Sequence, residues 1–334
     1  MLPIDVNNIF SSEPGLFNQG ALDLFAYQYS GNPVYRRWCD LIVPAEHPKN
    51  AAGVPLFEHY TSIPAMPIGF FKTETVQTGN YVPTLFFESS GTTGTEQSKH
   101  YIKDEAVYKQ SFFTAFEQVY GPVTNWCIIG LLPAYLERPH SSLVYMVEHL
   151  IQASNNAHSG FYLYDHEALA KTLEANEAAG QKTLLIGVTF ALLDFAAQYQ
   201  MPLQHTTILE TGGMKGRRKE LTRAEVHETL MNAFLVPTIH GEYGMTELLS
   251  QAYATGNGIY KCPPWMRVLV TEEEDPLTVK TSGRGTLQVI DLANIHSCSF
   301  IATEDVGAVY ADGSFEVFGR MDHSALRGCS LMVI

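Results

Sequence analysis

Between residues 84 and 239, apolar strand-like segments alternate with helix-like segments, and this alternation constrains the fold more than any other feature. The expected strands are 84–87, 126–131, 161–164, 183–187, 206–209 and 236–239. The expected helices are 104–120, 141–152, 165–179, 191–199 and one that opens with the capping box Thr222 and Glu225. Strands that alternate with helices build parallel sheets covered by helices. We therefore predict an α/β fold with mainly parallel sheets and flanking helices.

Helix periodicity ends near residue 255, and short β-like segments follow it. They lie at 266–270, 286–290, 300–302, 307–310 and 314–318. The pair Asp312-Gly313 is typical of a hairpin turn. We predict an α/β core over residues 1–255 and a small β-rich subdomain over residues 256–334. The first eighty residues begin with helical-looking pieces such as 21–29. A proline-punctuated region follows, with Pro44, Pro48, Pro55, Pro64 and Pro67, and we expect it to be mostly irregular.

Composition excludes several classes of protein. The 334 residues are 46% hydrophobic, which is enough for a large core, and the formal net charge is −14. Only 21 residues are Lys or Arg, so we expect no nucleic-acid surface. No apolar run approaches the roughly 20 residues of a membrane span, and the start does not resemble a signal peptide. The five cysteines are widely spaced without a C-x-x-C pair. We therefore expect reduced thiols, no zinc site and a cytoplasmic protein.

Residues 88–100 read Glu-Ser-Ser-Gly-Thr-Thr-Gly-Thr-Glu-Gln-Ser-Lys-His and follow a predicted strand. Glycines let a backbone approach an anion, and hydroxyls and a lysine add donors and charge. The candidate phosphate-binding residues are Ser90, Gly91, Thr92, Thr93, Gly94 and Lys99. A Walker loop is excluded because Ser98 stands where that motif has glycine. The loop predicts a nucleotide site, with a plain Ser/Thr/Gly surface turn as the alternative.

The order of this loop resembles the signature loop of the AMP-forming adenylating superfamily, which includes acyl-CoA synthetases, peptide-synthetase adenylation domains and luciferases. The segment His240-Gly241-Glu242-Tyr243-Gly244-Met245-Thr246-Glu247 resembles a second motif of that superfamily, aromatic-Gly-x-Thr-Glu. The resemblance implies that Tyr243 and Gly244 lie at the adenine and that Thr246 donates to the α-phosphate. It also implies that Glu247 holds Mg²⁺, which prefers carboxylate and phosphate oxygens.

Further matches follow along the chain. Thr303-Glu304-Asp305 resembles the ribose-binding element, although Glu304 replaces the usual glycine, and Gly319-Arg320-x-Asp322 resembles the hinge motif. The resemblance implies that Asp305 and Arg320 bind the ribose, and that Arg320 also reaches phosphate. The pair Gly212-Gly213 matches the backbone that lies against adenine, with Lys215 adding charge beside it. His140 is the candidate histidine at the carboxylate pocket, and Lys99 or Lys215 is expected to contribute a catalytic cation.

The resemblance implies the large N-terminal domain of the superfamily without its C-terminal lid, because the sequence stops six residues after Gly328. Such a short form is similar to the luminescence-type (LuxE-like) acyl-protein synthetases. The implied activity is activation of a fatty or aryl acid by ATP and Mg²⁺ to an acyl-adenylate. Transfer to a thiol would follow, with Cys329 near the end, CoA or a carrier protein as acceptor, and an acyl reductase as a further partner.

Two other readings of the sequence remain open. One is a non-catalytic or partner-dependent relative that binds nucleotide or acyl groups, and the other is an unrelated α/β protein whose motifs match by chance. The identity of the acid, the oligomeric state and the pathway are left open by the sequence.

Overall fold

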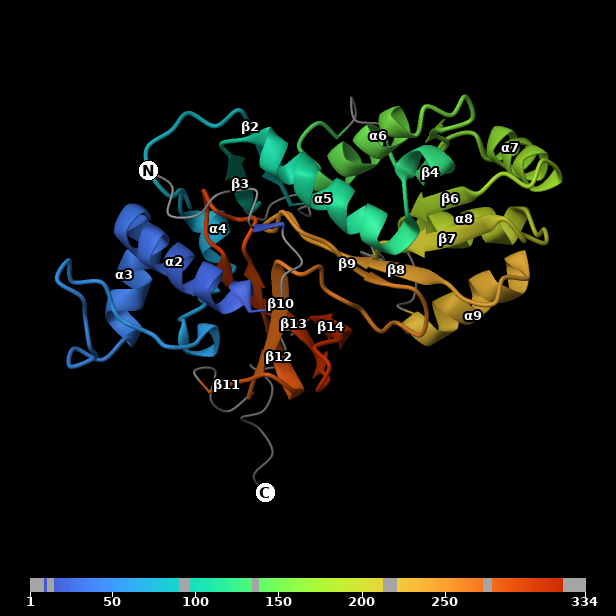
Figure 1. Cartoon of the computed structure of the whole chain (residues 1–334). Helices are drawn as coiled ribbons and strands as arrows, with labels where there is room; N and C mark the ends of the chain where they lie inside the picture. Colours follow the sequence, from blue (N-terminus) through green and yellow to red (C-terminus); the bar gives the residue numbers. More distant parts are fainter. Residues whose placement is uncertain are drawn as a thin grey trace, which may run out of the picture.

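The computed structural model describes residues 9–10, 15–89, 97–133, 138–212, 221–272 and 278–320. In this part of the chain a mainly parallel sheet and a mainly antiparallel sheet lie side by side, with helices packed around them (Figure 1).

The parallel sheet has the strand order β5-β4-β6-β7-β8-β9. Each described pair in this sheet is parallel except β8 with β9, which is antiparallel. Its strands are β4 (Cys127–Leu131), β5 (Gly160–Phe161), β6 (Thr183–Gly187), β7 (Thr206–Glu210), β8 (His240–Tyr243) and β9 (Ala252–Ala254). The predicted α/β class with parallel strands is therefore confirmed. The strand predicted at 236–239 is wrong, because the strand begins at His240. Pro237 lacks the N–H that a central strand needs.

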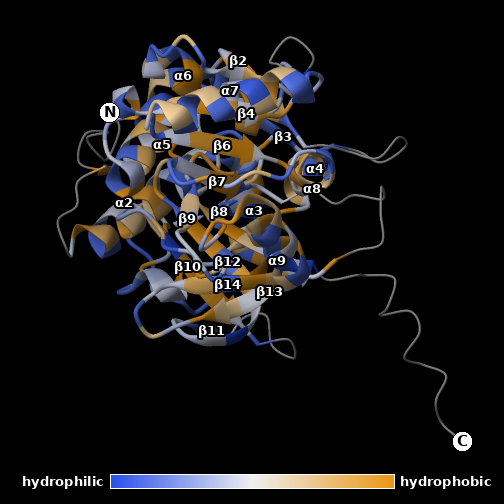
Figure 2. Ribbon diagram, turned by 90° about the vertical axis from the view of Figure 1, so that its right-hand side faces the viewer, coloured by the Kyte–Doolittle hydropathy of each residue, from blue (hydrophilic) through white to orange (hydrophobic). Residues whose placement is uncertain are grey.

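Helices cover both faces of this sheet. Alternate strand residues enter two different cores, as the two-residue period of a strand requires. Ile128 packs into one core with α5 and α6, whereas Ile129 packs into the other with α7, α8 and α9. The helices are α5 (Glu105–Tyr120), α6 (Ser142–Ser154), α7 (His166–Ala178), α8 (Thr189–Gln198) and α9 (Arg223–Phe234). Figure 2 shows the resulting apolar ribbon of β6 inside the molecule. The predicted capping box of α9 is present.

The second sheet has the order β1-β13-β12-β10-β11, and β14 also pairs with β13. Its strands are β1 (Met66–Pro67), β10 (Met266–Thr271), β11 (Val279–Lys280), β12 (Gly283–Asp291), β13 (Phe300–Val309) and β14 (Phe315–Arg320). The segments predicted as two strands at 300–302 and 307–310 are one continuous strand. The turn predicted at Asp312-Gly313 is confirmed, because Gly313 has a φ of +81° and its N–H donates to the carbonyl of Tyr310.

The N-terminal region packs on this second sheet. It contains α2 (Leu16–Gly31), α3 (Pro33–Ile42), α4 (Phe70–Thr73) and the short 3-10 helix η1 (Tyr60–Ser62); a second one, η2 (Val123–Asn125), precedes β4. Strand β1 runs parallel to β13, and the rings of Phe25 and Tyr35 contact Phe300. The helical piece expected near 21–29 lies within α2, and the proline-punctuated region after α3 contains only the short elements η1 and β1 before α4. The division of the chain at residue 255 stays a prediction.

Strands β2 (Leu85–Glu88) and β3 (Lys99–Ile102) form an antiparallel hairpin of their own. The predicted phosphate loop connects these two strands, whereas the sequence led us to expect a helix directly after the loop. Residues 90–96 of the loop, which include Ser90, Gly91, Thr92, Thr93 and Gly94, lie outside the described residues. Among the helices that the structure describes, none is long and apolar enough to cross a membrane.

Candidate nucleotide site

Three predicted site residues from distant segments are bonded to one another. The hydroxyl of Tyr243, at the end of β8, donates to Asp305 Oδ2 at 2.8 Å. The Nε–H of Arg320 donates to Asp305 Oδ1 at 3.1 Å. Asp305 and Arg320 are cross-strand partners of β13 and β14, so the hairpin turn fixes this ion pair. Asp305 is buried, and each carboxylate oxygen keeps a lone pair for a further donor.

The segment after β8, residues 244–251, is held by a buried carboxylate. Asp291 Oδ2 accepts from the backbone N–H groups of Leu249 and Ser250, each at 2.9 Å, and Asp291 Oδ1 accepts from the Ser250 hydroxyl at 2.6 Å and the Ala293 N–H at 3.0 Å. The Asn294 amide donates to the carbonyl of Glu247 at 2.8 Å. The Thr-Glu motif therefore sits on a rigid polar support.

His100 of β3 supports the same segment from the other side. Its Nδ1–H donates to the carbonyl of Thr246 at 2.9 Å, so its Nε2 accepts from the Ser297 hydroxyl at 2.8 Å. Burial lowers the pKa of His100 to about 4, and the bond to Thr246 opposes this only in part. The imidazole is thus neutral at physiological pH and links the phosphate-loop hairpin to the segment that carries Thr246 and Glu247.

Glu247 is 5% exposed and faces both the hairpin and the second sheet. Burial raises its pKa, and this is opposed by a hydrogen bond with Ser98 and by the positive charges of Arg320 and Lys72. Among the described residues no group of three or more His, Cys, Asp or Glu side chains could hold a metal ion. A single carboxylate still fits Mg²⁺ when substrate phosphates supply the other oxygens.

Gly244 separates Tyr243 from Thr246 and has a steric role. A Cβ built on Gly244 would lie 2.4 Å from Glu242 Oε1. The Glu242 side chain therefore points along β8 toward the carboxyl end of the sheet and occupies the space beside Gly244. Any larger residue at this position would displace a buried carboxyl group.

Gly212 follows the carboxyl end of β7 and is anchored by Glu210. The Gly212 N–H donates to Glu210 Oε1 at 2.8 Å, and Thr189 donates to the same oxygen. Gly212 has a φ of +75°, which favours glycine. Burial would raise the pKa of Glu210, but His227 at 3.8 Å, Thr189 and the more distant Arg223 outweigh it, so the pKa of Glu210 is lowered. A charged carboxylate thus fixes the start of the predicted adenine loop.

Lys99 and His140 form a second cluster, around Phe86 of β2. The His140 ring stacks on Phe86 at 4.1 Å between centroids, and Lys99 Nζ lies 5.7 Å from the Phe86 centroid. Lys99 Nζ also forms an ion pair with Glu88 at 3.3 Å. His140 accepts the Glu88 N–H at its carbonyl. Both residues therefore lie where the predicted phosphate loop leaves β2 and enters β3.

Comparison with solved structures relates this geometry to known proteins. ATP-bound MatB from Rhodopseudomonas palustris is 17% identical, with a TM-score of 0.52 over 70% of this chain and 47% of that one. The long-chain-fatty-acid-CoA ligase FadD1 from Archaeoglobus fulgidus is 16% identical, with a TM-score of 0.51 over 72% and 52%. The chain shares an α/β fold with these two structures. It spans about half the length of these two structures.

No protein-family model matches the sequence, and no curated protein matches it. Within this fold, Tyr243, Asp305, Arg320 and Glu247 lie toward one region, and Lys99 lies with His140 beside the hairpin. Gly213, Lys215 and Cys329 lie outside the described residues, as does the glycine loop. The individual roles of all these residues stay predictions.

Three residues that support the site were not predicted from the sequence, namely His100, Glu210 and Asp291. His100 directly follows the predicted loop lysine, and Glu210 directly precedes the predicted adenine loop. The positions of His100 and Glu210 next to these two motifs were the sequence signal that could have identified them. Asp291 offered none, because its partners at 249 and 250 are about forty residues away.

Proposed function

We propose that the protein activates a carboxylic acid by reaction with ATP and forms an acyl-adenylate. The observation that carries the proposal is the bonded set Tyr243, Asp305 and Arg320 with Glu247 nearby, on a fold also found in an ATP-bound protein. A carboxylate oxygen of the acid attacks the α-phosphorus of ATP. One oxygen–phosphorus bond forms, and the bond to the leaving pyrophosphate breaks.

The chain's own groups would bind and orient the two substrates. Asp305 accepts hydrogen bonds from the ribose hydroxyls, and Arg320 remains paired with it while facing phosphate. Thr246 donates to the α-phosphate. The loop residues Ser90 to Gly94 and the cations Lys99 and Lys215 neutralise phosphate charge. Such a reaction depends mostly on positioning and charge stabilisation.

Mg²⁺ fits this site through Glu247 and would neutralise charge on the phosphates of ATP. The support by His100 and Asn294 fixes the backbone of Thr246 and Glu247 before any ligand binds. The proposal places His140 at the carboxylate of the acid, beside Phe86. We assign the activity to the cytoplasm, where ATP is supplied.

The first experiment is carboxylate-dependent exchange between ATP and pyrophosphate with a panel of fatty and aryl acids. Exchange with one class of acid is expected and would name that class. Lys99→Ala and Lys215→Ala should each slow exchange, whereas Lys171→Ala, which removes an exposed helix pair with Glu167, should not. ATP-dependent thermal stabilisation without exchange by any acid would instead favour the non-catalytic relative.

We extend the proposal to transfer of the acyl group to a thiol, as in LuxE-like acyl-protein synthetases. The supporting feature is Cys329 in the sequence beside Arg327, which would favour the thiolate; CoA and a carrier protein are the other acceptors. The thiolate sulfur would attack the acyl carbon, and AMP would leave. An acyl reductase would be the natural consumer of the thioester.

Cys329→Ser is expected to abolish labelling of the protein by a radioactive acid while exchange with pyrophosphate continues. Labelling is measured after denaturation, with and without hydroxylamine, which cleaves a thioester. Cys262→Ser is the matched control, because burial raises the pKa of that thiol to about 12 and keeps it unreactive. Undiminished labelling of Cys329→Ser would rule out this acceptor and leave CoA or a carrier protein.

A further inference from the structure

Three buried polar side chains share the face of β8 and β9 that lies under α5. Glu242 and Tyr253 are cross-strand partners, and opposite residues of an antiparallel pair project from the same face. Gln251 directly precedes β9 (Ala252–Ala254), and its Cγ lies 3.4 Å from the position that a Cβ on Gly244 would take, beside Glu242 Oε1. Glu242, Gln251 and Tyr253 are 9%, 4% and 3% exposed. We call these three residues the β8–β9 polar cluster.

Two polar atoms of the β8–β9 polar cluster lack partners in the described part of the chain. Neither Gln251 Oε1 nor the Tyr253 hydroxyl has a hydrogen-bond partner within the part of the chain that the structure describes. Leaving a buried group unsatisfied costs about 1–3 kcal/mol, and most buried polar groups in proteins are paired. Burial, followed by the charge of Glu210, raises the pKa of Glu242 to about 8. Glu242 thus keeps its proton at neutral pH and can donate as well as accept.

The walls around the cluster do not supply the missing bonds. The Tyr120 ring packs edge-on against Tyr253 at 5.5 Å, but its hydroxyl is 3.2 Å from His240 Nδ1. The Tyr108 hydroxyl donates to the carbonyl of Ser142 and also hydrogen-bonds with the side chain of Gln251. Both tyrosines belong to α5, and neither hydroxyl is a partner of Gln251 Oε1 or of the Tyr253 hydroxyl in the described part of the chain.

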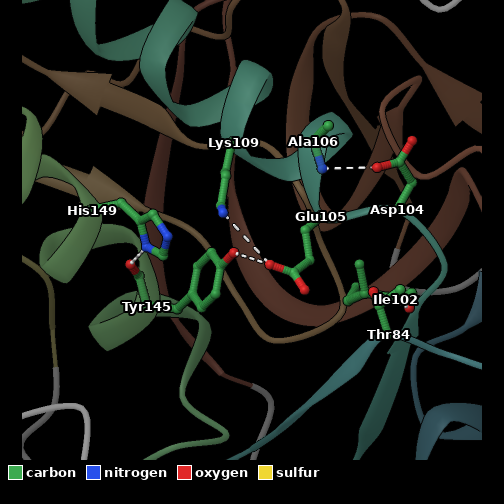
Figure 3. A network of polar contacts seen from close by, with 8 residues as sticks. All are labelled: Thr84, Ile102, Asp104, Glu105, Ala106, Lys109, Tyr145 and His149. Atoms are coloured by element: carbon green, nitrogen blue, oxygen red, sulfur yellow. Dashed lines mark hydrogen bonds and ion pairs between the residues drawn. The ribbon is translucent and has the colours of Figure 1, made fainter.

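Helix α5 is anchored and cannot easily shift toward the cluster. Figure 3 shows Glu105, in the first turn of α5, between the Tyr145 hydroxyl, which donates to it at 2.8 Å, and Lys109 Nζ at 3.5 Å. The Asp104 carboxylate caps the helix by accepting the Ala106 N–H at 2.9 Å. The missing partners must therefore come from outside this framework, either from water or from a ligand.

The cluster adjoins the candidate nucleotide site. Glu242 Oε1 lies beside Gly244, and Gln251 Cγ lies 3.4 Å from the same position. Gly244 opens the segment that carries Thr246 and Glu247, at the carboxyl end of β8. Ligands of open α/β sheets bind beyond the carboxyl ends of the strands. A substrate that meets ATP at Thr246 could thus extend to the cluster beneath α5.

We propose that the β8–β9 polar cluster binds a hydrogen-bond-donating group, a hydroxyl or an ammonium, on the chain of the carboxylic acid. This inference rests on the proposed function and narrows its substrate to a polar acid. Gln251 Oε1 accepts one hydrogen bond, and the carboxyl of Glu242 and the hydroxyl of Tyr253 accept others. A plain alkyl chain in this place would leave all three groups unpaired, which sites built for hydrogen bonding reject strongly.

The test compares straight-chain acids from butanoic to decanoic with their ω-hydroxy and ω-amino counterparts. Binding is measured as thermal stabilisation by each acid alone, and activation is measured as pyrophosphate exchange. We expect the best polar acid to exceed its alkyl counterpart in kcat/KM by about 10²-fold or more. The hydroxy and amino series decide which donor the cluster accepts.

Tyr253→Phe and Gln251→Leu are expected to lower kcat/KM for the preferred polar acid by about tenfold each, and to leave the values for alkyl acids unchanged or higher. Without ligand, Tyr253→Phe should melt at or above the wild-type temperature, because it removes an unpaired buried hydroxyl. Tyr162→Phe and Gln198→Leu, on the far side of the parallel sheet, are the matched controls.

Equal binding of alkyl and polar acids would overturn the proposal. A lower melting temperature of Tyr253→Phe without ligand would also overturn it, by showing that structural water satisfies this hydroxyl. If no acid supports exchange but polar acids still stabilise the wild type more than alkyl acids do, the site is confirmed and the proposed adenylation fails. The experiment therefore distinguishes failure of the polar-acid site from failure of the proposed adenylation.

Discussion

Asp305→Ala is expected to lower kcat/KM for ATP in the exchange assay by about 10². The carboxylate of Asp305 is already fixed by Tyr243 and Arg320, so it needs no reorganisation to accept the ribose hydroxyls. Removing it deletes charge-assisted hydrogen bonds and leaves the buried Tyr243 hydroxyl without its partner. Arg320, whose side chain is largely exposed, would lose its orientation.

A second nucleotide separates a ribose contact from a general loss of structure. If Asp305 binds the ribose, wild-type protein should use 2′-deoxy-ATP less well than ATP, and Asp305→Ala should no longer distinguish them. The measured quantity is the amount by which Asp305→Ala reduces the kcat/KM ratio of ATP to 2′-deoxy-ATP. Asp312→Ala, in the exposed hairpin turn between the same two strands, is the control and should keep the preference. If Asp305→Ala still prefers ATP over 2′-deoxy-ATP as strongly as the wild type does, the ribose does not bind at Asp305.

The fold was predictable where its cause is local. The strands β4, β6 and β7 are short segments rich in buried apolar and β-branched residues, and each lies between helices, so their pattern is visible in the sequence. Strand β3 was missed because its sequence, Lys-His-Tyr-Ile, has little apolar character and its stability comes from pairing with β2. The shift of β8 has a similar origin. Its sequence His-Gly-Glu-Tyr is polar, whereas the preceding Val-Pro-Thr-Ile looks more like a strand.

The site was predictable only as a set of separate motifs. The turn at Asp312-Gly313 is visible in the sequence, but the register that places Arg320 opposite Asp305 is not. Contacts such as His100 with Thr246 join residues 146 positions apart, and no local pattern encodes such a pair. The same holds for the β8–β9 polar cluster, since the lack of partners around Gln251 and Tyr253 depends on how α5 packs.

Asp291→Ala is expected to destabilise the protein by at least about 3 kcal/mol and to lower the melting temperature by roughly 5–10 °C. Asp291 is fully buried and accepts four hydrogen bonds, from the N–H groups of Leu249, Ser250 and Ala293 and from the Ser250 hydroxyl. Alanine would leave these donors unpaired in the interior. Chemical denaturation followed by tryptophan fluorescence measures the loss.

The matched control is Asp104→Ala, which removes an exposed helix cap with one backbone donor and should cost only about 1 kcal/mol. Asp291→Asn should fall between the two, because its oxygen can still accept while its NH₂ group opposes a donor. Since the same four bonds hold the segment behind Thr246 and Glu247, exchange activity should fall in the same order at temperatures where each variant remains folded. A variant at 291 that keeps full exchange activity despite the lost stability would show that the site does not depend on this support.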